Sequence, residues 1–471
     1  MKEALPSASS VRGGLADRRV RVLKSGILAA IALLGLPSTM SRLLNVAFYI
    51  IDTLVLGIIG SDALAVIGVV GPLFMVLTSP ALLVSSYTTA VVSQLVGAGR
   101  YGDLARTGGM ILGASLILGS LSALLMVIVA PIAYQLQGVP ESVLDDSLAY
   151  TYSIAPGIPG LFLAYFFINS MTASGDAKTP LKLNAAAAAI NTVLTPILGL
   201  GLLGAPSLGV IGVGLSSSIS RIVVALYALI YLWRGGLGVV IRPLTPSASL
   251  ARKMIAVGSP VALNNLALGA GLIVFVSIVS GLGPTVLAAY SLSLRLIEVL
   301  QEVSYGLNQA ISTIVGQRLG AGMTRSARDA ALEGSFMIYT SIAALSVLIY
   351  LASKHCIAAL SAGDIVMEAI RMIEIVIIGA PFLGLIHAAT AVSRGSGHTA
   401  IPSLIGVARI WLLRIPLAVV LAGHYGSTGI WLSITVSNIV SGVASMAWIL
   451  LYPWTKSDVI SKRGGLTSSP P

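Results

Sequence analysis

Charged side chains are scarce in this sequence: they make up 10% of its 471 residues, against about a quarter of a soluble domain. Hydrophobic residues make up 56% of the chain, and the mean hydropathy is +0.95. This composition excludes a chain that is surrounded mainly by water, so we expect an integral membrane protein.

Cysteine is nearly absent as well, because Cys356 stands alone. A single cysteine excludes an intramolecular disulfide and a metal cluster held by cysteines. The sequence also lacks a nucleotide-binding loop, a zinc-binding helix motif and a serine nucleophile elbow. Gly97-Ala98-Gly99-Arg100 starts like a phosphate loop but has no Gly-Lys-Ser/Thr ending. We therefore expect no enzyme and no cofactor.

Long apolar runs are abundant instead. A transmembrane helix needs about 20 apolar residues, and about twelve runs of that length or more are separated by polar breaks. They lie near residues 26–57, 63–94, 106–135, 146–173, 180–203, 208–234, 252–282, 286–317, 327–357, 366–393, 401–423 and 427–453. The sequence therefore predicts an all-α polytopic membrane protein with about 12 transmembrane helices, many of them tilted or kinked.

Basic residues gather in every second connection between these runs. The connections on the side of the N-terminus hold nearly all of them, including Arg100 and Arg106, Lys178 and Lys182, several within 234–253 and 318–328, Arg394 and Lys456. The alternate connections carry mainly acids, with Lys354 as the main exception. This positive-inside asymmetry predicts cytoplasmic termini, and it accounts for the net charge of +11 without a nucleic-acid partner. We expect no signal peptide, because the first apolar run is too long and no small-residue cleavage site follows it.

The chain repeats itself. At a shift of 223 residues Pro37 falls on Pro260, and Gly97-Ala98-Gly99 falls on Gly320-Ala321-Gly322. At a shift of 222 Pro180 meets Pro402, and at 217 Gly212 meets Gly429. Chance matches of small residues would not keep one register over some sixty residues and then return to it. We therefore predict an internal duplication.

Each half holds six spans, so both copies enter the membrane the same way up, and a pseudo-two-fold axis runs along the membrane normal. A parallel repeat of this kind favours a transporter that rocks around a cleft between its lobes. The predicted parts are a cytoplasmic segment 1–25, an N-lobe 26–234, a cytoplasmic linker 235–251, a C-lobe 252–453 and a cytoplasmic tail 454–471. The energy must come from an ion gradient or from a partner protein, and the gradient is the simpler source.

Asp52 is the strongest candidate for a functional residue. A carboxylate at the centre of a bilayer costs roughly 2.5–3.5 kcal/mol on insertion scales, and Asp52 lies within an apolar stretch with no basic residue near it in sequence. Asn45, Tyr49 and Asp52 are spaced i, i+4, i+7 and so share one helix face. The alternative is a carboxylate that only packs helices together through a hydrogen bond to a neighbouring hydroxyl.

Two further spans carry polar groups at a similar depth. At about 1.5 Å per residue, Asp52, Thr195 and Ser217 lie roughly 9–14 Å below the external ends of the first, fifth and sixth helices, and Asn191 lies one turn before Thr195. Together they offer the oxygen ligands of a Na⁺ ion, above all at Asp52 and Asn191, or they tune Asp52 for a proton. Taken one by one, the amide and the hydroxyls favour interhelical hydrogen bonds.

The second half has no acid at the equivalent of Asp52, because the shift of 223 places Phe275 there. Its charges are Arg295, Glu298 and Glu302 in the eighth span and Arg409 and Arg414 in the eleventh. Ion pairing is the favoured interpretation, and an unpaired Glu298 or Glu302 would instead be a cation or substrate site in the cleft. Pro37 bends the first helix, about four turns before Asp52, either as a hinge or as a static kink.

These residues resemble the multidrug and toxic compound extrusion (MATE) family, most nearly its archaeal and bacterial members with an acid in helix one. The resemblance covers about residues 26–453. It rests on Tyr49-Ile50-Ile51-Asp52-Thr53 followed by Gly60, the paired Gly-Ala-Gly segments, Ser174-Gly175-Asp176, and Arg414-Ile415-Pro416-Leu417-Ala418.

The resemblance implies cation-coupled export of amphipathic, often cationic compounds through a cleft between two lobes. It implies that Asp52 is the coupling carboxylate, that Pro37 is the bending proline, and that Asn191 and Ser217 fall on cation-site positions. Archaeal-type members have Asp-Pro where this chain has Thr195-Pro196, and a further subgroup has an acid in helix seven where this chain has Asn264-Asn265. These departures favour protons over Na⁺ and leave Asp52 to work alone.

Two other classes of protein remain open. A flippase for lipid-linked saccharides shares the paired lobes, and Arg295, Arg409 and Arg414 favour it. A membrane scaffold or receptor would explain the helices but not the duplication or the intramembrane Asp52. We expect small-molecule substrates, surrounding membrane lipids, a monomer and a place in the plasma membrane.

Overall fold

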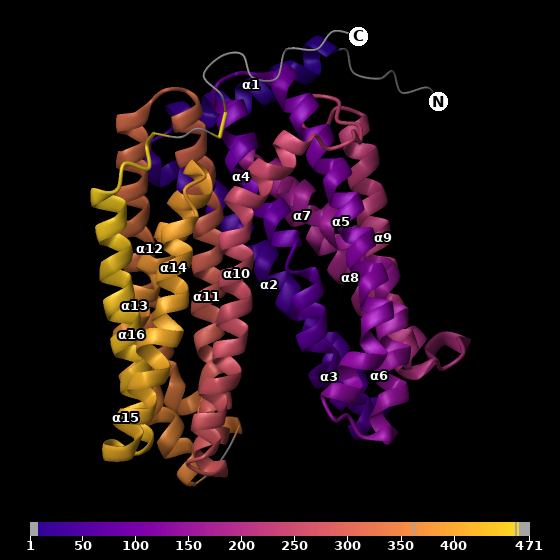
Figure 1. Ribbon diagram of the computed structural model, residues 1–471, viewed down its shortest axis with the longest axis vertical. Coiled ribbons are helices and arrows are strands. Elements are labelled where there is room, and N and C mark those ends of the chain that lie inside the picture. Colours follow the sequence, from indigo (N-terminus) through magenta and orange to yellow (C-terminus); the bar gives the residue numbers. More distant parts are fainter. Residues whose placement is uncertain (1–7, 361–362, 457–458, 461–471) are drawn as a thin grey trace. The chain divides into compact units, whose positions relative to one another are not determined.

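The computed structural model describes residues 8–360, 363–456 and 459–460, and among these residues it has no strand. The helices (Figure 1) are α1 Ala8–Lys24, α2 Ile27–Ile59, α3 Ser61–Thr78, α4 Ala81–Gly97, α5 Tyr101–Leu136, α6 Glu141–Ile154, α7 Ile158–Ala173, α8 Lys178–Leu200, α9 Gly209–Trp233, α10 Ala248–Ser280, α11 Pro284–Gly320, α12 Thr324–Leu360, α13 Asp364–Ser396, α14 Ala400–Ala408, α15 Ile415–Tyr425 and α16 Ser427–Leu451. Two short 3₁₀ turns, Ala155–Gly157 and Leu202–Gly204, and one π-helical turn, η3 Arg409–Arg414, complete them. The prediction of an all-α fold is confirmed.

Each predicted apolar run corresponds to a helix or to a broken pair of helices. Within the described part of the chain, 11 helical segments are long and apolar enough to cross a membrane. The run 63–94 is divided into α3 and α4 at Ser79 and Pro80, and the run 286–317 is the more polar helix α11. The chain is therefore a multi-pass membrane protein.

The chain folds as two compact units of nearly equal size. Unit 1 holds the residues up to Lys24 together with Met40–Ser259, and unit 2 holds Ser25–Thr39 together with the chain from Pro260 onward. Helix α2 thus begins in unit 2 and continues in unit 1, with the change two residues after Pro37. Helix α10 changes from unit 1 to unit 2 at the equivalent Pro260.

The start of α2 packs closely within unit 2. Gly306 on α11 has no side chain, and the backbone of Thr39 occupies the space that a Cβ there would need. A Cβ on Gly35 would in turn lie 3.0 Å from the Leu307 side chain. Small residues that let helix backbones approach are a normal device in membrane proteins, and here they fix the first half of α2.

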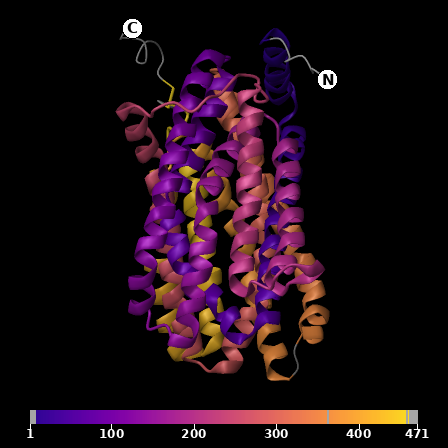
Figure 2. The ribbon, with the colours of Figure 1, turned by 90° about the vertical axis from the view of Figure 1, so that its right-hand side faces the viewer.

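In unit 1 the central helix is α7, which packs against α4, α5 and α9. The purple and magenta helices of this unit run along the vertical in Figure 2. Helices α8 and α9 form a close pair, and the backbone of Leu198 occupies the space beside Gly212. The close contact of the two helices brings their polar side chains within hydrogen-bonding distance of one another.

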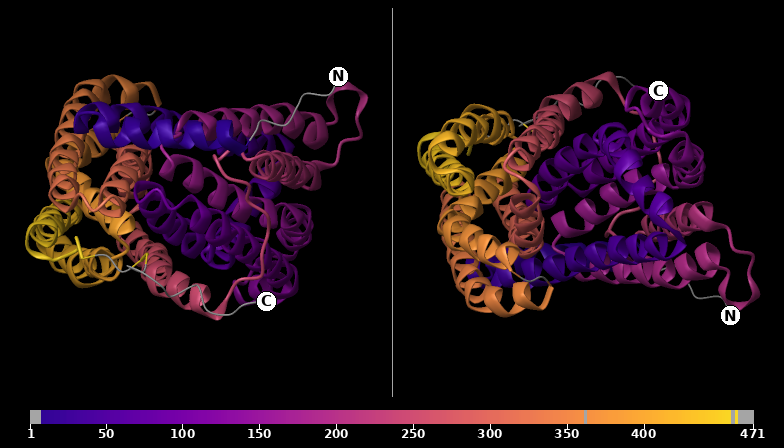
Figure 3. Two further views of the ribbon diagram at one scale, coloured as in Figure 1. Left: turned by 90° about the horizontal axis from the view of Figure 1, so that it is seen from above. Right: turned by 90° about the horizontal axis from the view of Figure 1, so that it is seen from below.

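In unit 2 the central helix is α13, which packs against α11, α12 and α16. The orange and yellow helices of this unit are seen nearly end-on in Figure 3. In the sequence, α13 is the equivalent of α6 and α7 at a shift of 222 residues. The central helix of unit 2 is therefore the repeat of the segment that contains the central helix of unit 1. The same shift places α8 on α14, η3 and α15, and the shift of 217 places α9 on α16.

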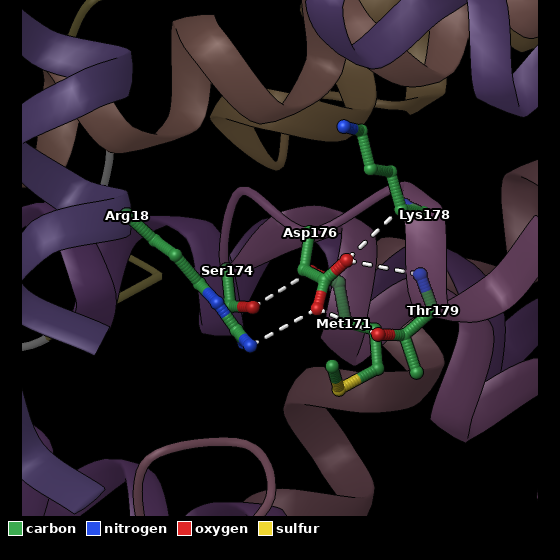
Figure 4. Close-up of polar contacts among 6 residues, drawn as sticks. All are labelled: Arg18, Met171, Ser174, Asp176, Lys178 and Thr179. Atoms are coloured by element: carbon green, nitrogen blue, oxygen red, sulfur yellow. Dashed lines mark hydrogen bonds and ion pairs between the residues drawn. The ribbon is translucent and has the colours of Figure 1, made fainter. Parts of the chain in front are cut away.

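Helix α1 is attached to the rest of unit 1 by polar contacts of two adjacent arginines. Arg18 forms a 3.0 Å ion pair with Asp176, and Arg19 Nε donates to the Gly97 carbonyl at 3.0 Å. Asp176 also accepts hydrogen bonds from the backbone N–H groups of Lys178 and Thr179 and from the Thr179 hydroxyl (Figure 4). The left panel of Figure 3 shows α1 lengthwise while the spanning helices are seen end-on. The predicted segment 1–25 is therefore largely a helix from Ala8.

The segment between α9 and α10 packs on the first half of α5. Leu244 N–H donates to the Gly109 carbonyl at 2.9 Å, and Leu237 and Ile241 are fully buried. Gly109 and Gly113 leave room for the backbone at Arg242 and Leu244. The predicted linker 235–251 is thus held against unit 1, and its last residues already belong to α10.

Candidate cation site

Asp52 lies in the second half of α2, within unit 1, and only 5% of it is exposed. Its Oδ2 accepts a 2.8 Å hydrogen bond from the Ser217 hydroxyl of α9. Its Oδ1 accepts from the Thr195 hydroxyl at 3.0 Å and from Asn191 Nδ2 at 3.2 Å, both on α8. The structure therefore brings together all four residues that depth counting had grouped.

The pairing of α8 with α9 explains why these groups meet. Asn191 and Thr195 are one helical turn apart and share a face of α8. Thr195 also shares a 2.6 Å hydrogen bond with the Ser216 hydroxyl, and Asn191 Nδ2 donates to Ser217 at 3.4 Å. The two helices can approach this closely because Gly212 lies one turn before Ser216 and carries no side chain.

Asn191 Oδ1 is buried and has no hydrogen-bond partner among the described residues. The site thus holds an unused acceptor beside a carboxylate. Carboxylate, amide and hydroxyl oxygens are the ligands of hard cations, and Asp52, Asn191, Thr195 and Ser217 supply all three kinds. Only one of these groups carries a negative charge, and no group of three His, Cys, Asp or Glu residues in the described chain is arranged to hold a metal ion.

The remaining residues that the sequence singled out are Asn45, Tyr49, Glu298 and Glu302, and none of the described hydrogen bonds to Asp52 involves them. Tyr49 is 58% exposed, and the side chain of Asn45 lies outside the described ones. Glu298 pairs with Arg295 at 3.1 Å on an exposed face of α11, and Glu302 is half-buried on the same helix. Their roles, and that of Pro37 as a hinge, stay predictions.

Sequence analysis missed Arg221, which lies one turn beyond Ser217 on α9. None of the ion pairs among the described residues joins it to Asp52. The guanidinium lies 5.3 Å from the centre of the Phe74 ring, and its Nη1 is buried without a hydrogen-bond partner in the described chain. Arg221 lies in the middle of a span, which by itself marks an arginine as a functional candidate.

Known proteins are similar to this chain over most of its length. The chain is 26% identical over 428 residues to "Probable multidrug resistance protein YoeA" of Bacillus subtilis, covering 89% of this chain and 92% of that protein. It is 24% identical over 448 residues to "Probable multidrug resistance protein YpnP" of the same organism, covering 93% and 98%.

A solved structure described as an "Outward-facing conformation of a multidrug resistance MATE family transporter of the MOP superfamily" has the same fold. Its TM-score is 0.84 at 18% identity, and the match covers 92% of this chain and 97% of that one. The MatE family model matches the chain twice, over residues 37–197 and 260–420. The two matches start 223 residues apart (260 − 37), at Pro37 and Pro260, so the predicted duplication is confirmed and the chain belongs to the MatE family of membrane transporters.

Proposed function

We propose that the protein exports amphipathic, cationic compounds from the cell by antiport against a cation that binds at Asp52. The observation that carries this proposal is the buried Asp52 carboxylate, which accepts three hydrogen bonds from α8 and α9 inside the membrane-spanning part of unit 1. A carboxylate is kept there at a cost in solvation free energy, and ion coupling is a reason to keep it. The two Bacillus relatives are named as probable multidrug resistance proteins, which supports the export of several compounds.

The coupling ion in this proposal is a proton. Na⁺ prefers a site with more negative charge than one carboxylate, and Thr195 stands where a second acid would be needed. A proton requires only Asp52 and an acceptor for the new O–H. Asn191 Oδ1 can supply that acceptor if the amide turns over, because its Nδ2 now faces Asp52 Oδ1.

Protonation then changes how Asp52 holds the neighbouring helices. A neutral carboxyl accepts weaker hydrogen bonds than a carboxylate, so the contacts to Thr195 and Ser217 loosen when the proton binds. Asp52 lies on α2, whose first residues belong to unit 2 and whose remainder belongs to unit 1. We infer that α2 bends near Pro37 as these contacts change, and that this bend couples the ion to alternating access.

In this proposal the protein is a monomer in the plasma membrane with both termini in the cytoplasm, surrounded by lipids and without a nucleic-acid partner. It needs no cofactor beyond the coupling ion. Asn45 and Tyr49 of unit 1 and Glu298 and Glu302 of unit 2 are each proposed to contact transported compounds.

The test uses purified protein in lipid vesicles loaded with rhodamine 123, a fluorescent amphipathic cation. Asp52→Asn should abolish gradient-driven transport and leave the yield of folded protein unchanged. Asp62→Asn, which changes an exposed acid at the start of α3, should transport like the unchanged protein. Transport by Asp52→Asn at the unchanged rate would exclude the coupling role. Each gradient is imposed alone, and transport driven by Na⁺ without a proton gradient would overturn the choice of proton.

A flippase for lipid-linked saccharides is the second candidate. It is favoured by two arginines inside unit 2, Arg409 and Arg414, since such a protein must hold a pyrophosphate within the membrane. Transfer of a short-chain fluorescent lipid diphosphate across the same vesicles, without transport of rhodamine 123, would favour it.

A further inference from the structure

Two arginines meet in the middle of a membrane-spanning segment of unit 2. The span Ala400–Tyr425 consists of α14, η3 and α15, and Arg409 and Arg414 begin and end its π-helical turn. Arg409 Nη1 donates to Asn438 Oδ1 of α16 at 3.0 Å, and Arg414 Nη2 donates to the same oxygen at 2.7 Å. One neutral amide oxygen thus receives hydrogen bonds from both guanidinium groups.

The π-helical turn is what brings the two side chains together. In an α-helix, residues five apart point about 140° away from each other. A π turn has i→i+5 hydrogen bonds, so residues five apart lie nearly above one another. The turn is held in place by α10, where Trp411 Nε1 donates to the Ala267 carbonyl at 2.8 Å and Ile410 fills the space beside Gly271.

The positive charges of this pair are not balanced by a carboxylate. None of the ion pairs among the described residues includes Arg409 or Arg414. Their other contacts are neutral: Arg414 Nε donates to the Ser437 hydroxyl at 3.0 Å, and its guanidinium lies 5.9 Å from the centre of the Phe275 ring. Two like charges side by side in a low-dielectric region are costly without a counter-charge.

The pair also has hydrogen-bond donors to spare. Arg409 Nε is buried and has no partner among the described residues. A guanidinium group has five N–H donors, and the hydrogen bonds described above use one donor group of Arg409 and two of Arg414. Each residue is half-buried as a whole, and its spare N–H donors are what it can offer to a ligand.

We propose that Arg409 and Arg414 form an oxyanion site that binds the carboxylate or phosphate group of an amphipathic transported compound. The planar guanidinium forks match the paired oxygens of such groups, and the bound anion supplies the missing counter-charge. Phe275 stands at the position equivalent to Asp52, and Arg414 lies beside it. The polar groups near this position therefore include an acid in unit 1 and arginines in unit 2. The inference rests on the proposed export function and extends its cargo to zwitterionic and anionic compounds.

The test measures binding to the purified protein in detergent, where no gradient is needed. Rhodamine 110 carries a free carboxylate, and rhodamine 123 is its methyl ester. The unchanged protein should bind rhodamine 110 about tenfold more tightly than rhodamine 123, the size expected for charge-assisted hydrogen bonds. Farnesyl diphosphate, with farnesol as its uncharged match, is added as a competitor to detect a lipid phosphate at the same site.

Two variants remove the site in different ways. Arg414→Gln removes one guanidinium group. Asn438→Asp replaces the amide that both arginines contact with a carboxylate. It gives the pair a counter-charge inside the protein that competes with a bound anion, and it does not depend on the folding of Arg414→Gln. In both variants the ratio of the two dissociation constants should fall to about one. Arg371→Gln, an arginine of the same unit that is 60% exposed and lies 3.7 Å from Glu368, is the matched control and should keep the ratio.

The outcomes separate the sources of the oxyanion. Preference for rhodamine 110 without competition assigns the site to carboxylate compounds, and competition by farnesyl diphosphate assigns it to lipid phosphates. An unchanged preference in Asn438→Asp, or no dependence of either probe on the arginines, would overturn the site. Export of rhodamine 123 that depends on Asp52 would still stand in that case, so the two proposals can fail separately.

Discussion

The Ser217 hydroxyl donates a 2.8 Å hydrogen bond to Asp52 Oδ2, whereas the hydroxyl of the next residue, Ser218, donates to the Ser153 carbonyl at 2.7 Å. Two adjacent serines of α9 therefore have different tasks. Ser217 holds the carboxylate of α2, and Ser218 joins α9 to the end of α6.

We expect Ser217→Ala to impair coupling without a large loss of stability. A hydrogen bond to a charged group contributes about 1.5–3 kcal/mol, so the affinity of the site for its ion should change by about tenfold or more. The measurement is the ion-concentration dependence of rhodamine 123 transport in vesicles.

Ser218→Ala is the matched control for this change. It should lower the melting temperature slightly, because a buried carbonyl loses its donor, and leave the ion dependence as it was. Equal ion dependences in the two variants would show that the Ser217 contact plays no part in coupling.

Thr195→Asp should change the ion that drives transport. Thr195 Oγ1 lies 3.0 Å from Asp52 Oδ1, so an acid there places a second carboxylate beside the first. Two carboxylates so close repel each other and bind a shared cation or proton more tightly. We expect this variant to gain transport driven by a Na⁺ gradient alone.

Thr195→Asn is the control for that gain, because it adds a polar group of similar size without charge. A Na⁺ response in Thr195→Asn as well would mean that space and oxygen ligands, rather than charge, decide the ion. A lack of any Na⁺ response in Thr195→Asp would mean that a second carboxylate is not what Na⁺ requires here.

The grouping of the site could be predicted from the sequence because depth in a membrane follows from counting. The rise of a helix is constant, so the distance of Asp52, Thr195 and Ser217 from the ends of their spans follows from their numbers. The direction in which each side chain points around its helix depends on which backbones approach. Here the close approach depends on the contact of Gly212 with α8. The spacing of apolar residues in the sequence does not reveal that contact.

The features that were missed differ in how far the sequence could have revealed them. Arg221 is a charge in the middle of a span and was detectable from its position alone. The π-helical turn was not detectable, since it changes the register between Arg409 and Arg414 without a change in hydropathy. The attachment of α1 depends on Arg18 reaching Asp176, a contact between residues far apart in the sequence, and helix propensity says nothing about such a contact.

Asp176→Ala should destabilise the end of unit 1 on which α1 packs. The carboxylate pairs with Arg18 at 3.0 Å and accepts three hydrogen bonds at the start of α8. Loss of such a capping contact alone costs about 1–2 kcal/mol, and here α1 loses its ion pair as well. The melting temperature of the purified protein should fall, and α1 should become more accessible to protease.

Asp103→Ala separates this effect from the loss of any surface acid. Asp103 pairs with Arg100 at 2.6 Å, but both side chains are nearly two-fifths exposed, and exposed pairs contribute about 0–1 kcal/mol. A double-mutant cycle of Arg18→Ala with Asp176→Asn isolates the ion pair. Additive effects in that cycle would show that α1 is held by its apolar contacts alone.

Gly113→Ala should detach the segment that leads from α9 to α10. A Cβ at Gly113 would meet the backbone carbonyl of Leu244, and backbone cannot move aside as the end of a side chain can. The overpacking costs about 1–3 kcal/mol, and it also strains the nearby hydrogen bond from Leu244 N–H to the Gly109 carbonyl.

Gly102→Ala on the same helix meets nothing within 4 Å, so it should leave the melting temperature unchanged or raise it slightly. Hydrogen exchange across residues 237–247 should speed up in Gly113→Ala only, since the segment is anchored to α5 through Leu244. Unchanged exchange there would mean that the buried side chains of Leu237 and Ile241 suffice to hold the segment without that anchor.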